Sequence, residues 1–133
     1  MKKYNLTKED RELIKKAKVV SKRKKVSGGV IGEVGCALST KKRIYTGVSI
    51  NLCCGIGFCA EHSAVADMVS HSNETEIKTI VALWVDGKKW GILYPCGRCR
   101  ELMQQINMKN RENTWVIISP KEKVKLKELL PEE

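Results

Sequence analysis

A run of apolar and β-branched residues spans positions 79–85 of this 133-residue chain, and an Asp86-Gly87 turn follows it. Because apolar side chains occupy both faces of such a strand, neither face is suited to contact with water. The strand is therefore expected to lie inside a sheet that other elements cover on both sides. This segment favours a layered α/β fold.

Helical signals precede and follow this strand. Thr7 and Asp10 resemble a capping box, and they predict a helix over residues 8–21, in which apolar residues recur at helical spacing. Two later segments are rich in helix-forming residues. They are expected to start at or just before Cys59 and to run from Pro95 to about Ile106.

Four further segments have the composition of strands and are bounded by turn residues. They cover residues 30–38, 43–50, 114–118 and 124–130. The first two are expected to form a hairpin, and the last ends in one helical turn. The order α-β-β-α-β-α-β predicts an α/β fold, a three-layer α/β/α sandwich with a mixed central sheet. At 15.0 kDa and 42% hydrophobic residues, residues 1–133 are expected to form a single domain.

The net charge of +10 is concentrated at one end of the chain. Residues 1–25 carry 11 basic and 3 acidic side chains, whereas residues 26–133 carry 14 and 12. A basic helix ending in residues 22–25 could contact phosphates or an acidic partner, and a solvated helix face is the simpler interpretation. No segment resembles a membrane span or a signal peptide, so a cytoplasmic protein without membrane contact is expected. Six cysteines in this setting favour reduced thiols and metal binding over disulfides.

Cysteines at two predicted helix starts carry the chemistry. Cys96 and Cys99 form a C-x-x-C pair, a spacing shared by redox dithiols, structural zinc sites and catalytic zinc sites. Cys59 lies 37 residues before Cys96, and Glu61 follows two positions after Cys59. Three thiolates and one carboxylate are typical of a catalytic zinc site that keeps its fourth position for water. A structural site with a fourth protein ligand and a chance clustering of core cysteines remain alternatives. The candidates for a fourth ligand are Cys53, Cys54 and His62.

The spacing of these residues resembles a known signature. CAE at residues 59–61, with PCGRC at residues 95–99, is similar to the double motif of the zinc deaminases of the cytidine deaminase superfamily. VGCAL at residues 34–38 and ELLP at residues 128–131 also resemble segments of cytidine deaminases. Residues 91–100 are most similar to the corresponding stretch of blasticidin-S deaminases.

The resemblance implies a cytidine deaminase-like fold and a metal site. Cys59, Cys96 and Cys99 would bind one Zn²⁺ per subunit with a bound water or hydroxide, and Glu61 would be the catalytic acid and base. The implied reaction is deamination of the cytosine ring of a nucleoside to the uracil form, with release of ammonia. Implied substrates are cytidine, deoxycytidine or an antibiotic such as blasticidin S, in pyrimidine salvage or antibiotic resistance. A homotetramer is implied as well.

The sugar-binding positions depart from the family pattern. Cytidine deaminases bind the ribose with an Asn and with a Glu two residues later, and the corresponding residues here are Ser49 and Asn51. The carboxylate for the 3′-hydroxyl is therefore missing from this position, which favours a nucleoside with an altered sugar. Phe58, Ala60 and Tyr94 complete the substrate-binding candidates, because they flank the two cysteine motifs.

Two other functions stay open from the sequence. The basic N-terminus suggests a deaminase that acts on nucleic acid, but such relatives generally use His where this chain has Cys59, and no basic track lies near the motifs. The second alternative is a binding module in which zinc only stabilises the fold. Such a module requires a fourth protein ligand and releases no ammonia.

Overall fold

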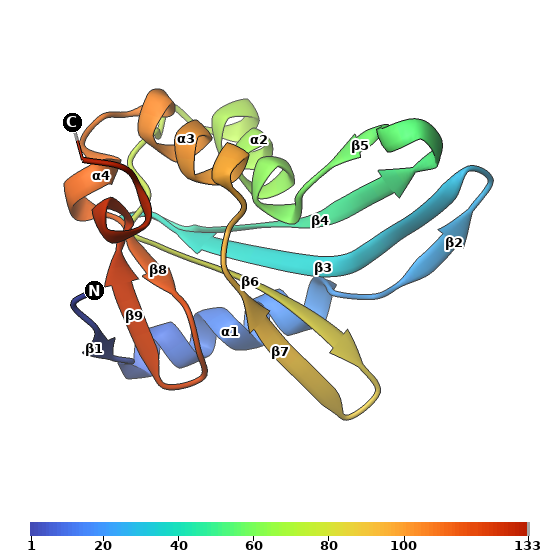
Figure 1. Cartoon of the computed structure of the whole chain (residues 1–133), viewed down its shortest axis with the longest axis horizontal. Coiled ribbons are helices and arrows are strands. Elements are labelled where there is room, and N and C mark those ends of the chain that lie inside the picture. Colours follow the sequence, from blue (N-terminus) through green and yellow to red (C-terminus); the bar gives the residue numbers. More distant parts are fainter. Residues whose placement is uncertain (133) are drawn as a thin grey trace.

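The computed structural model describes residues 1–132 and shows a sheet with helices on both faces (Figure 1). The helices are α1 (Lys8–Val20), α2 (Ala60–His71), α3 (Gly97–Ile106) and α4 (Asn110–Asn113), with 3-10 turns at η1 (Cys53–Gly55) and η2 (Leu126–Leu129). The strands are β1 (Tyr4–Asn5), β2 (Lys24–Val26), β3 (Gly29–Ser39), β4 (Ile44–Leu52), β5 (Gly57–Phe58), β6 (Thr79–Asp86), β7 (Lys89–Leu93), β8 (Trp115–Ile117) and β9 (Glu122–Lys125). Within residues 1–132, no helix is both long enough and apolar enough to cross a membrane.

The strands form one mixed sheet. Their order is β1-β9-β8-β6-β3-β4-β5, with β2 added to β3 and β7 added to β6. Strands β6 and β8 run parallel, whereas β3 is antiparallel to both β4 and β6. Helix α1 packs on β3 and β6, while α2 packs on β3 and β4 and contacts α3 on the other side of the sheet (Figure 1). The three-layer α/β/α sandwich expected from the sequence is confirmed.

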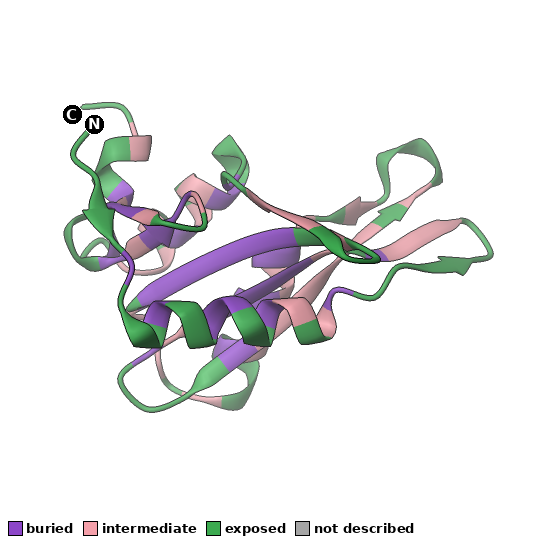
Figure 2. Ribbon diagram, turned by 90° about the horizontal axis from the view of Figure 1, so that it is seen from below, coloured by how far each residue is buried: buried purple, intermediate pink, exposed green. Residues whose placement is uncertain are grey.

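Strand β6 is buried on both faces, as its continuous apolar run predicts. Ile80 and Ala82 belong to the core cluster shared with α2, and Val81 and Leu83 belong to the cluster shared with α1. Because successive side chains of a strand point to opposite faces, one strand contributes to two cores. Figure 2 shows buried stretches along the central strands of the sheet and buried positions alternating with exposed ones along α1.

The predicted capping box is present at the start of α1. The Thr7 hydroxyl accepts a hydrogen bond from the backbone N–H of Asp10, and the Asp10 carboxylate accepts one from the backbone N–H of Thr7. The Asp10 carboxylate also lies 2.7 Å from the Lys123 ammonium on β9, and both side chains are nearly buried. Asp10 therefore caps the helix and ties its first turn to the sheet.

The basic run at residues 22–25 does not form the end of a helix. Helix α1 ends at Val20, and Ser21 caps it with a backbone N–H that reaches the carbonyls of Ala17 and Lys18. Lys24–Val26 form strand β2, which pairs with β3 and is exposed. Pairing to the sheet therefore overrides the expected continuation of a basic helix, and the positive charges lie on a hairpin.

Strand β7 is absent from the sequence-based prediction, because its central glycine is a poor strand former. In the structure, Gly91 lies opposite Trp84 on β6. A Cβ atom at Gly91 would lie only 2.7 Å from the indole nitrogen of Trp84. The glycine therefore makes room for the tryptophan, and the β6–β7 hairpin forms across it.

Gly47 on β4 sets how closely α2 approaches the sheet. A Cβ atom at this position would lie 2.3 Å from the backbone nitrogen of Ala64 and 2.6 Å from Cβ of Ser63, both in α2. The nearest atom belongs to backbone and cannot turn away as a side chain can. The absence of a side chain at Gly47 thus brings the first turns of α2 directly against β4.

We predict that Gly47→Ala lowers the free energy of unfolding by about 1–3 kcal/mol, because the added methyl group must displace the helix. Urea unfolding followed by circular dichroism measures this change. Gly28→Ala is the matched control, since a Cβ atom there meets no heavy atom within 4 Å, and it should stay within about 0.5 kcal/mol of the parent. Equal unfolding midpoints for the two variants would contradict the role of Gly47.

Candidate metal centre

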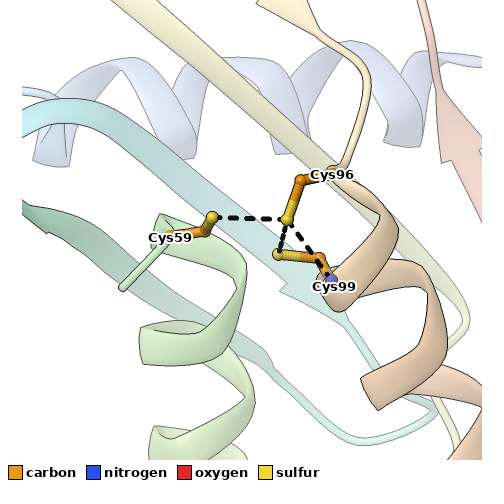
Figure 3. A group of neighbouring side chains, drawn as sticks. All are labelled: Cys59, Cys96 and Cys99. Carbon is orange, nitrogen blue, oxygen red and sulfur yellow. Dashed lines mark hydrogen bonds between the residues drawn. The ribbon is translucent and has the colours of Figure 1, made fainter. Parts of the chain in front are cut away.

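Two helix N-termini bring three cysteines together (Figure 3). Cys59 is the N-cap residue of α2, Cys96 is the N-cap residue of α3, and Cys99 lies in the first turn of α3. The Cys96 sulfur lies 3.5 Å from the Cys59 sulfur and 3.3 Å from the Cys99 sulfur. All three sulfur atoms lie within 4.8 Å of one another. The convergence predicted for these cysteines is therefore present in the fold.

The spacing of the sulfur atoms fits a tetrahedral metal ion. Zinc–sulfur bonds of roughly 2.3 Å in tetrahedral geometry separate neighbouring sulfurs by about 3.8 Å, close to the distances seen here. Among the described residues, the cluster contains no fourth His, Cys, Asp or Glu ligand. Cys53 and Cys54 are exposed on η1, outside the cluster. Three protein ligands are the number used by catalytic zinc sites, whereas structural sites use four.

The helix ends favour thiolate at one of the three positions. Burial raises the pKa of Cys96, but hydrogen bonds from the backbone N–H of Cys99 and from the neighbouring thiols outweigh burial and lower it overall. Burial is also the largest cause that raises the pKa values of Cys59 and Cys99, and adjacent negative groups add to it. A bound cation would remove this penalty, because it stabilises all three thiolates together.

Glu61 lies beside the cluster, next to the Cys99 thiol. It is the second residue of α2 and is only 5% exposed. Burial raises its pKa, and its own backbone N–H and the Cys99 thiol partly offset that effect. A carboxyl group in this setting is suited to both accepting and releasing a proton.

His62 contacts the cluster without joining it. Its Nδ1 atom lies 3.3 Å from the Cys99 sulfur. Burial lowers the pKa of His62, and the positive charge of Arg98 lowers it further. A neutral imidazole with its proton on Nδ1 donates a hydrogen bond to a thiolate, so His62 is placed to support a ligand.

Arg100 holds the segment that carries Cys96 and Cys99. Its Nε atom donates a hydrogen bond to the carbonyl oxygen of Pro95 at 2.7 Å, and its Nη1 atom donates one to the carbonyl oxygen of Leu129 at 3.1 Å. The arginine therefore connects the loop before α3 to the C-terminal η2 turn. Sequence analysis did not assign this role to Arg100, because both acceptors are backbone atoms.

Cys59 lines a cavity of about 430 Å³. This volume is within the usual range for small-molecule binding sites. Four of the predicted substrate-binding residues line it, namely Ser49, Asn51, Phe58 and Ala60. Tyr94 does not line it and is 46% exposed in the loop between β7 and α3. The structure thus brings together the candidates from β4, β5 and α2 and leaves Tyr94 outside.

The cavity wall includes two residues that the sequence analysis did not single out, Glu33 and Val34 on β3. The pairing of β3 with β4 shifts between Ile31 and Gly35. In this interval the backbone N–H of Val34 donates a hydrogen bond to the Ser49 hydroxyl at 3.0 Å. The sequence offers one signal for Glu33, namely that this charged residue interrupts the apolar strand segment at residues 30–38.

Comparison with known proteins identifies the family. The family model for the cytidine and deoxycytidylate deaminase zinc-binding region matches residues 7–112. A mutant cytidine deaminase from Mycobacterium tuberculosis is 25% identical, with 74% of this chain and 76% of that chain covered and a TM-score of 0.61. Two further cytidine deaminases share the fold. The protein from Burkholderia pseudomallei is 19% identical, covers 96% of this chain and 98% of its own, and has a TM-score of 0.66. The protein from Bacillus anthracis is 18% identical, covers 92% of this chain and 87% of its own, and has a TM-score of 0.72.

The matched region contains the three cysteines and Glu61. It spans most of the chain, and the sequence resemblance to the superfamily is confirmed. The chain therefore belongs to the family defined by the cytidine and deoxycytidylate deaminase zinc-binding region.

Proposed function

We propose that this protein is a zinc-dependent hydrolase that converts the cytosine ring of a nucleoside to the uracil form and releases ammonia. The supporting observation is the position of buried Glu61 beside a cluster of three cysteines, of which Cys59 lines a cavity of about 430 Å³. Family membership supports the same chemistry. We assign Cys59, Cys96 and Cys99 as the ligands of one Zn²⁺ per subunit.

Glu61 performs the proton transfers in this proposal. Zinc, when bound, lowers the pKa of water and so makes hydroxide available at neutral pH. Glu61 takes a proton from the attacking water and delivers it to N3 of the ring as the C4–O bond forms. It then transfers the remaining water proton to the amino group, and the C4–N bond breaks to release ammonia. The carboxylate ends the cycle ionised, and one water is consumed for each ammonia released.

The cavity residues orient the substrate. Phe58 precedes Cys59 and offers an apolar ring for packing on the flat base. Ser49 and Asn51, on β4, offer a hydroxyl and an amide to the sugar. Ala60 forms the wall beside Cys59. Tyr94 does not line the cavity, and its contact with the substrate stays a prediction.

We extend the proposal to the identity of the substrate, the biological role and the oligomeric state. The altered residues at positions 49 and 51 favour a modified cytosine nucleoside such as blasticidin S over cytidine. The proposed biological role is therefore antibiotic resistance or pyrimidine salvage. A homotetramer is proposed as well. Exposed apolar side chains at Ile56 and Val69, which are 65% and 44% exposed, are of the kind that subunit contacts bury.

The metal assignment predicts one zinc ion per chain. Cys96→Ser should lose most of this zinc, because a hydroxyl is a far weaker ligand than a thiolate for this metal. Cys53→Ser is the matched control and should retain it, since Cys53 is an exposed cysteine outside the cluster. Elemental analysis of the purified proteins measures zinc per chain. Full zinc in Cys96→Ser would remove Cys96 from the ligand set.

The catalytic assignment predicts that Glu61→Gln binds zinc but loses turnover. An amide cannot take a proton from water, so kcat should fall by a factor of roughly 10² to 10⁴. Ammonia release from cytidine, deoxycytidine, blasticidin S and adenosine by the zinc-loaded protein measures both the activity and its substrate class. A variant with kcat near that of the parent would refute the role of Glu61. Release from adenosine alone, or from none of the four, would contradict the proposed reaction.

A further inference from the structure

A bulge in β3 presents Glu33 at the cavity. Regular pairing with β4 is interrupted between Ile31 and Gly35, and Gly32 within this interval has a φ of +75°. A Cβ atom at Gly32 would lie 2.2 Å from the carbonyl oxygen of Lys22, so the position requires glycine both for space and for its backbone conformation. Bulges of this kind redirect the side chains next to them. Here the neighbouring residue, Glu33, lines the cavity.

Glu33 is the only carboxylate among the described residues that line this cavity. Its neighbours on the wall include Ser49 and Asn51, which occupy the positions expected to contact the sugar. The Ser49 hydroxyl already accepts a hydrogen bond from the backbone of Val34, so its own proton remains free to be donated. The cavity thus combines a hydroxyl, an amide and one strong acceptor that comes from the adjacent strand.

We propose that Glu33 accepts a hydrogen bond from a sugar hydroxyl of the substrate and makes a neutral nucleoside preferred over its 5′-phosphate. This inference rests on the proposed function, because it concerns the substrate of the same site. A carboxylate accepts hydroxyl protons well and repels a phosphate. This acceptor comes from β3 rather than from position 51, and it can serve any nucleoside whose sugar carries a hydroxyl group there.

The charges around Glu33 are consistent with this assignment. The Arg23 guanidinium lies 3.9 Å from the Glu33 carboxylate, with 56% of the Arg23 side chain and 43% of the Glu33 side chain exposed. Arg23 precedes β2, whose Lys24 and Lys25 are also exposed. The Arg23–Glu33 pair is long and solvent-exposed, so it leaves the Glu33 carboxylate able to accept a hydrogen bond from a hydroxyl.

Ligand binding and turnover test the inference separately. Titration calorimetry with the zinc-loaded full chain measures the Kd for uridine and for uridine 5′-monophosphate in the parent, Glu33→Ala and Glu33→Gln. Loss of a hydrogen bond to a charged acceptor should raise the Kd for uridine at least about tenfold in Glu33→Ala. The rise should be smaller in Glu33→Gln, whose amide oxygen still accepts. The KM for cytidine should rise in parallel while kcat changes by less than about threefold.

Relative affinity for the phosphate should move in the opposite direction. Both Glu33 variants should bind uridine 5′-monophosphate as well as the parent does, or more tightly. Glu112→Gln is the matched control, because Glu112 is also an exposed glutamate in a surface ion pair, with Lys127 at 3.2 Å. It should change neither the Kd values nor the KM. Equal thermal midpoints would show that the Glu33 variants remain folded.

The possible failures are distinguishable. An unchanged Kd for uridine in Glu33→Ala, or tighter binding of the phosphate than of uridine by the parent, would overturn the inference and leave the deaminase proposal intact. Uridine binding that depends on Glu33, in a parent that releases no ammonia, would overturn the proposed reaction and support the inference. A parent that binds no uridine would overturn the inference.

Discussion

The candidate metal site depends on two helices, α2 and α3, whose N-termini lie next to each other. The three sulfur atoms meet only because Cys59 caps α2 and Cys96 caps α3. The close approach at Gly47 holds α2 against the sheet. The hydrogen bonds of Arg100 to the carbonyls of Pro95 and Leu129 hold the start of α3. Both anchors end on backbone atoms, one through direct contact of α2 with β4 and the other through the Arg100 side chain.

This arrangement concentrates negative charge, and the same fold offsets it. The start of α3 presents the Cys99 backbone N–H to the Cys96 sulfur, and the positive dipole ends of α2 and α3 both lie at the cluster. His62 contacts the Cys99 sulfur, and Arg98 lies close enough to lower the pKa of His62. These groups are the candidates to offset the charge of the three thiolates in the proposed zinc site. Glu61 is the buried carboxyl group beside the cluster, where the proposed reaction uses a proton acceptor.

Local sequence signals predicted much of the fold. The Thr7–Asp10 capping box and the apolar run at residues 79–85 were sufficient for α1 and β6, because their determinants lie within the segment itself. β7 was not predicted because its central residue, Gly91, is a poor strand former. Gly91 is needed only because the Trp84 side chain on the opposite strand occupies the space of a Cβ atom. Strands β1 and β5 have two residues each, which is too few to show a period. Tertiary pairing, which no local pattern encodes, decided these elements.

The candidate site likewise contains residues that local motifs predict and residues that only the tertiary structure places there. The clustering of the three cysteines was predicted because their spacing is a signature within two short motifs, while the role of Glu61 stays a proposal. Glu33 was missed because a bulge, rather than a motif, brings it to the cavity beside Ser49. Tyr94 was included because it is adjacent to a motif in sequence, although it lies outside the cavity.

Isotope labelling tests the central claim most directly, namely that this chain hydrolyses the amino group of a cytosine ring. The zinc-loaded protein would be incubated with a cytosine nucleoside in water enriched in ¹⁸O, and the products would be analysed by mass spectrometry. The account predicts a uracil nucleoside with one ¹⁸O atom at C4 and one equivalent of ammonia. An unchanged nucleoside, or a uracil product without the label, would contradict it.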